Sequence, residues 1–68
     1  MTNTEGKNAL LNRTPVIFNN IEYLYITKII YQYDENNNLF ISAELLDKSR
    51  RSVTIARLKD VITYDKQN

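Results

Sequence analysis

The residue types that most often carry out catalysis are scarce in this sequence. Among its 68 residues there is no histidine and no cysteine, and glycine occurs once, at Gly6. Histidine is the commonest general base, cysteine is a common nucleophile, and phosphate-binding loops need several glycines at fixed offsets. A zinc site would depend on carboxylates alone, which is an unusual ligand set. We therefore expect a protein that is not an enzyme, with no metal site and no other cofactor.

Carboxylates are the remaining groups that could act in acid–base or metal chemistry. Glu44 falls in the middle of a predicted strand, on the face opposite the apolar residues, where it could pair with Lys28, Arg57 or Lys48 on a neighbouring element. Residues 34–38, DENNN, are acidic but lack the alternating ligands, the glycine and the distal glutamate of an EF-hand loop. We interpret Glu44 as a surface ion-pair partner and residues 34–38 as a solvated turn.

Two groups of side chains could instead serve binding. Four of the five tyrosines lie at odd-numbered positions of one run and would share one face with Ile29 if that strand were regular: Tyr23, Tyr25, Tyr31 and Tyr33. The most basic segment is residues 47–52, DKSRRS. Tyrosine suits protein interfaces, and tyrosines beside basic side chains are typical of sites for single-stranded nucleic acid. The sequence thus indicates five binding residues, namely Tyr31, Tyr33, Lys48, Arg50 and Arg51.

The charge balance ranks these two functions. The formal net charge is only +1, and an acidic pair, Asp34 and Glu35, sits in the central loop. A strongly basic domain would favour nucleic acid, but this one is nearly neutral. We expect a binding or accessory module that contacts a protein partner or a second copy of itself, with single-stranded nucleic acid as the alternative. We expect no small-molecule substrate.

Length and composition bound the organisation of the chain. Sixty-eight residues form one domain, which buries only roughly 60% of the surface of its unfolded chain and so gains from a partner. No secretion signal is visible, and polar residues interrupt the longest apolar run, so we expect a cytoplasmic protein with no membrane contact. Frequent Asn, Ile, Lys and Tyr, which have A/T-rich codons, suggest a bacterial, phage or mobile-element origin.

The segments that must position these residues are predicted to be strands. Residues 21–46 read as a hairpin of two β-rich runs around residues 34–38. Both faces of the long run 21–33 are apolar, so we expect a strand that bends at Thr27–Lys28 and serves two sheets. A helix over this run is disfavoured because tyrosine and isoleucine prefer strands and no capping residue precedes it. Residues 39–47 form the next strand, with its core face made up of Leu39, Ile41, Ala43 and Leu45.

The flanking segments complete a small domain over residues 14–65. Residues 14–18 form a first strand, and Asn19–Asn20 form a two-residue turn that pairs Phe18 with Ile21 and Val16 with Tyr23. Residues 52–58 form a strand with Val53 and Ile55 inward, followed by a 3₁₀ turn between Leu58 and Val61 and a last strand over residues 62–65. Residues 1–13 are expected to be a flexible tail with at most one helical turn over residues 8–12, and residues 66–68 a second tail.

This order of elements resembles an SH3-like barrel. Five short strands, a long central hairpin and one 3₁₀ turn before the last strand carry the resemblance, which covers residues 14–65. The peptide-binding signature of signalling SH3 domains is missing, since there is no ALYDY-like stretch and no tryptophan. The resemblance implies an all-β, bent antiparallel meander. An open, bent sheet that needs a dimer for stability is the second possibility, and an OB barrel, which usually needs more residues, the third.

Overall fold

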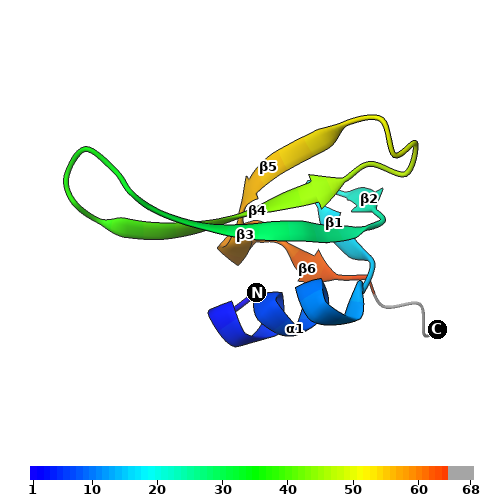
Figure 1. Cartoon of the computed structure of the whole chain (residues 1–68), viewed down its shortest axis with the longest axis horizontal. Helices are drawn as coiled ribbons and strands as arrows, with labels where there is room; N and C mark the ends of the chain where they lie inside the picture. The colour runs from blue at the N-terminus through cyan, green and yellow to red at the C-terminus, as the bar shows by residue number, and fades with distance from the viewer. Residues whose placement is uncertain (65–68) are drawn as a thin grey trace.

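A computed structural model of the protein describes residues 1–64, and it is mostly β (Figure 1). One helix and one 3₁₀ helix accompany six strands: α1 (Asn3–Asn12), β1 (Val16–Phe18), β2 (Ile21–Tyr23), β3 (Tyr25–Tyr33), β4 (Leu39–Leu46), β5 (Val53–Arg57), η1 (Leu58–Asp60) and β6 (Ile62–Thr63). The strands form two antiparallel three-stranded sheets with the orders β2–β1–β6 and β3–β4–β5. The predicted β class is confirmed. No closed barrel is found among the described residues, so the SH3-like barrel stays a prediction.

The turn between β1 and β2 forms as predicted. Asn19 and Asn20 have φ angles of 56° and 64°, in the left-handed region that asparagine tolerates. Two successive residues with positive φ give the twist that a two-residue hairpin needs. The strands pair Val16 with Tyr23 and Phe18 with Ile21, which confirms the predicted register.

The long run 21–33 serves two sheets, but it divides earlier than predicted. Leu24 separates β2 from β3, and its N–H donates to the carbonyl oxygen of Leu46 at 2.9 Å. A second irregularity follows in β3, where the register shifts between Ile26 and Lys28 and leaves Thr27 without a partner in the ladder. This bulge lies where the sequence predicts the bend. A bulge inserts one extra residue and increases the local twist of the strand.

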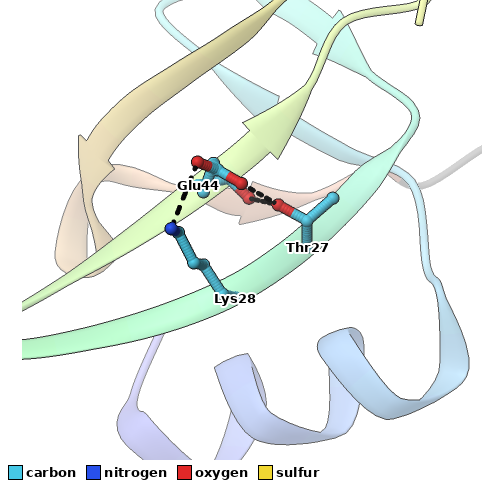
Figure 2. Close-up of polar contacts among 3 residues, drawn as sticks. All are labelled: Thr27, Lys28 and Glu44. Atoms are coloured by element: carbon cyan, nitrogen blue, oxygen red, sulfur yellow. Dashed lines mark hydrogen bonds and ion pairs between the residues drawn. The ribbon is translucent and has the colours of Figure 1, made fainter.

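Side chains from β3 and β4 contact one another at this bulge (Figure 2). The Thr27 hydroxyl donates to Oε1 of Glu44 at 2.6 Å and also lies 3.2 Å from the Glu44 carbonyl oxygen. The Lys28 ammonium lies 3.7 Å from the other carboxylate oxygen of Glu44. Glu44 therefore takes part in the predicted ion pair with Lys28, and it also binds the residue that the bulge leaves unpaired.

The N-terminal segment differs from the expected flexible tail, because ten residues of it form α1. A capping box begins the helix: the Thr2 hydroxyl accepts from the Glu5 N–H at 3.1 Å, and the Thr2 N–H donates to the Glu5 carboxylate at 2.9 Å. Gly6 lies within the helix and against Leu58. A β-carbon on Gly6 would come within 2.8 Å of a Leu58 methyl carbon, so the glycine permits a close approach.

The core lies between the two sheets and α1. Nine hydrophobic residues are buried in it: Ala9, Val16, Tyr23, Ile26, Ala43, Leu45, Ala56, Leu58 and Val61. Leu58 begins η1 and Val61 follows it, and both are buried, which confirms the predicted 3₁₀ turn at this position. The last predicted strand is present as β6 but covers only Ile62–Thr63, since Tyr64 is not part of it. Residue 65 and the tail 66–68 lie outside the described residues.

The face of β5 that meets the core is the reverse of the predicted one. Ile55, expected inward, is 53% exposed, and Val53 is 48% exposed, whereas Ala56 is buried. The register explains this, because Ala56 pairs with the buried Ala43 and residues that lie opposite each other share a face. The larger side chains of Val53 and Ile55 thus face outward, and the small Ala56 occupies the core position.

Candidate binding surfaces

The predicted binding residues lie at opposite ends of the β3–β4–β5 sheet. Tyr33 pairs with Leu39 at one end of β4, and Tyr25 pairs with Leu46 at the other end. The basic loop, residues 47–52, follows Leu46, so it is separated from Tyr33 by nearly the full strand, roughly 20 Å at 3.3 Å per residue. Figure 1 shows the loop between β3 and β4 and the loop between β4 and β5 at the two ends of the molecule. The structure therefore does not bring the five residues into one site.

The end of the β3–β4 hairpin forms an arm that projects past the other strands (Figure 1). The arm surface consists of Tyr31, Tyr33, Leu39 and Ile41, which come from adjacent cross-strand pairs. These residues share the face of Ile29 and the buried Ala43, so they continue the core face beyond the point where the core ends. Tyr31 is 52% exposed, Tyr33 67% and Leu39 53%. The result is a half-exposed apolar patch on a two-stranded ribbon.

A groove of about 350 Å³ lies at the base of the arm. Its lining comes from the start of the chain, from β4 and from the turn after β5: Met1, Asn3, Leu39, Phe40, Ile41, Arg57, Leu58 and Lys59. The Tyr31 hydroxyl donates to the Asn3 side-chain oxygen, and the Arg57 guanidinium lies 4.0 Å from the centre of the Phe40 ring. The groove thus combines apolar walls with two cationic side chains.

At the opposite end, hydrogen bonds within the chain shape the basic loop. The Asp47 carboxylate accepts from the Ser49 N–H at 2.8 Å, and the Arg50 N–H donates to the Asp47 carbonyl oxygen at 2.8 Å. Hydrogen bonds from Ser49 lower the pKa of Asp47. Lys48 contacts Glu22 on β2 at 2.7 Å, and this hydrogen bond raises the pKa of Lys48. Lys48 is therefore engaged within the fold, while the loop directs Arg50 and Arg51 to the surface.

Arg50 belongs to a group of side chains whose proximity is not predicted from the sequence. The guanidinium carbons of Arg13 and Arg50 lie 5.7 and 5.9 Å from the centre of the Tyr25 ring, within cation–π range. Nη1 of Arg50 also donates to the Tyr25 hydroxyl at 3.4 Å. We call these three residues the Tyr25 cluster. Arg13 and Tyr25 also line a groove of about 430 Å³ whose remaining lining is Leu10, Leu11, Ile26 and Thr27, and Arg50 reaches it through its contact with Tyr25.

The sequence contained one signal that could have located this cluster. Arg13 was assigned to a flexible tail, and Tyr25 was grouped with the other tyrosines of its run. The capping box at Thr2 and Glu5 predicts a helix, and the end of that helix places Arg13 close to β3. The apolar residues on both faces of the run predict a bend at Thr27–Lys28 but not the extra residue of a bulge, and it is the bulge that separates the face of Tyr25 from that of Tyr31.

No metal site, membrane-spanning helix or related protein adds a further candidate site to those described in residues 1–64. Within residues 1–64, no group of three or more acidic, histidine or cysteine side chains could hold a metal ion. No helix in this part of the chain has the length and apolar character needed to cross a membrane. Comparisons of the chain with protein-family models, with curated proteins and with solved structures give no match.

Proposed function

We propose that the chain is a non-catalytic interaction module that binds a protein partner, or a second copy of itself, through the arm surface. The observation that carries the proposal is the exposure of Tyr31, Tyr33 and Leu39 on a ribbon that extends past the core. Tyrosine presents a large ring with a polar tip and is enriched at protein interfaces. A two-stranded ribbon is marginally stable by itself in water, so a partner on the arm would also stabilise it.

The area of the patch limits the affinity that it can supply. Covering the exposed parts of two tyrosines and one leucine removes roughly 300 Å² from water, which is worth about 6–8 kcal/mol before the costs of association. Those costs are themselves about 4–15 kcal/mol. The arm alone therefore supports weak binding, and a stable complex also uses the groove at its base, where Arg57 and Lys59 add cationic contacts.

The order of the elements supports an SH3-like architecture for this module. β6 follows η1 and returns to pair with β1, and the meander β3–β4–β5 forms the second sheet. The cytoplasmic location and the bacterial, phage or mobile-element origin rest on composition alone and stay predictions.

Site-specific photo-crosslinking in the native cell tests the proposal. A benzophenone amino acid replaces Tyr33 on the arm or, as the matched control, Ile55 on β5, which is 53% exposed. We expect protein adducts from position 33 that disappear when Leu39→Ser is added, and none from position 55. Sedimentation of the pure protein shows whether the adduct is a second copy. Equal adducts from both positions, or none from either, would refute the proposal.

A further inference from the structure

The backbone at two arginines is unusual. Five described residues have positive φ: Asn19, Asn20, Asn37, Arg13 at 52° and Arg50 at 64°. Asparagine visits the left-handed region readily, because its short polar side chain can hydrogen-bond locally, whereas most other residues adopt it at a cost. Asparagine or glycine would thus suit positions 13 and 50 better. The local fold therefore does not explain why arginine stands at either one.

The same two arginines converge on Tyr25. They come from the end of α1 and from the β4–β5 loop, so their meeting depends on the tertiary fold. The ion pairs described in residues 1–64 are Lys28–Glu44 and Lys48–Glu22, and neither includes them. Both guanidiniums lie within 6 Å of one ring centre without a described carboxylate partner, an arrangement that a bound anion would stabilise.

The adjoining groove indicates what else the ligand contains. Its other walls include Leu10, the 73% exposed Leu11 and Ile26, and its volume of about 430 Å³ falls in the range of small-ligand sites. A fitting ligand combines a flat apolar body with an anionic head. Arginine binds phosphate oxygens in a bidentate manner, and its guanidinium plane also stacks on nucleobases.

We propose that the Tyr25 cluster binds a nucleotide unit. Arg13 and Arg50 hold the phosphate, and the base lies over the leucines of α1. The Tyr25 hydroxyl accepts a hydrogen bond from Arg50, which leaves its own proton available for a phosphate oxygen. The unit can be a free nucleotide or part of a single strand. This site lies at the other end of the sheet from the arm, so it is independent of the proposed protein interaction.

Fluorescence anisotropy with a labelled single-stranded oligonucleotide, and competition by a free mononucleotide, test the site over a range of salt. Two phosphate contacts predict a slope of log affinity against log salt near −1.4, or about a sevenfold loss of affinity between 50 and 200 mM salt. Arg13→Asn and Arg50→Asn keep the left-handed backbone, and each should reduce the slope by about 0.7. Lys7→Gln removes an equal charge from an exposed position of α1 that belongs neither to the cluster nor to either groove, and it should leave binding unchanged.

Thermal melting of the same variants separates binding from a structural role. We expect Arg13→Asn and Arg50→Asn to melt at or above the temperature of the parent, because asparagine relieves the backbone cost. If the mononucleotide displaces the oligonucleotide, the site binds a single nucleotide. If the oligonucleotide binds but the mononucleotide does not displace it, the site is specific for single-stranded nucleic acid. No binding of either probe, an equal loss in Lys7→Gln, or a marked fall in melting temperature in both arginine variants would overturn the proposal.

Discussion

A comparison of Ile55→Ala on β5 with Leu45→Ala on the neighbouring β4 tests which face of β5 meets the core. Leu45 is fully buried, so Leu45→Ala should cost about 2.7–5 kcal/mol in the free energy of unfolding. Ile55 is 53% exposed, so Ile55→Ala should cost only about 1 kcal/mol. A domain of this length has a total stability of roughly 3–10 kcal/mol. The first variant should therefore be close to unfolding, while the second should remain folded.

Urea denaturation followed by far-ultraviolet circular dichroism measures both costs, since the chain has no tryptophan to report on unfolding. For this size, 1 kcal/mol corresponds to a change in melting temperature of about 7 °C. Ala56→Leu is the complementary variant and should destabilise by about 1–3 kcal/mol through overpacking. If Ile55→Ala costs as much as Leu45→Ala while Ala56→Leu is tolerated, the register of β5 is shifted by one residue and the assignment is wrong.

Three further predictions concern the turns and the bulge. Asn20→Gly creates Asn-Gly, the pair that a type I′ turn favours most, and this gain should offset the roughly 0.5–1 kcal/mol that glycine costs through its freedom in the unfolded chain, so a lower thermal midpoint would contradict the turn geometry. Hydrogen bonds from backbone N–H groups, first that of Asn38, lower the pKa of Asp34 below its ordinary 3.8. The ionised Asp34 therefore stabilises the folded state above pH 3.8, and this stability is lost as the pH falls through the lowered pKa. Asp34→Asn should make the urea midpoint less dependent on pH between about pH 5 and pH 2. Thr27→Val should cost about 1 kcal/mol and Lys28→Met about 0.5 kcal/mol or less in thermal melts, and the reverse order would show that the ion pair holds the bulge.

Local patterns in the sequence were sufficient to predict the turns. The Asn19–Asn20 turn and its register follow from the positive φ that asparagine tolerates, and the 3₁₀ turn follows from the spacing of Leu58 and Val61. Local propensity does not predict α1, because glycine is unfavourable inside a helix. Gly6 stands in the helix because α1 packs closely against Leu58 at this position, and no local pattern in the sequence reveals this tertiary contact.

The exposure of Tyr31 and Tyr33 could be predicted from the sequence, but the distance between these tyrosines and the basic loop could not. Tyr31 and Tyr33 do share an exposed face, since they lie beyond the bulge and in one regular stretch. Tyr23 is buried and Tyr25 lies on another face, because the break at Leu24 and the bulge change which residues face the core. Odd and even positions keep to one face only within an uninterrupted strand. The apolar pattern predicts a bend at Thr27–Lys28, but it predicts neither the extra residue of the bulge nor the break at Leu24.

The bulge at Thr27 also bears on how this chain can vary over evolution. Tyr25 lies before the bulge and Tyr31 after it, and the one extra residue keeps them on different faces of the sheet. Substitutions can therefore change the two surfaces separately. A deletion at Thr27 would instead force one half of β3 to turn over, so that either the arm tyrosines or Tyr25 would exchange faces with their neighbours. We expect insertions and deletions in homologues to collect in the loops at residues 34–38 and 47–52, with the length of β3 held constant.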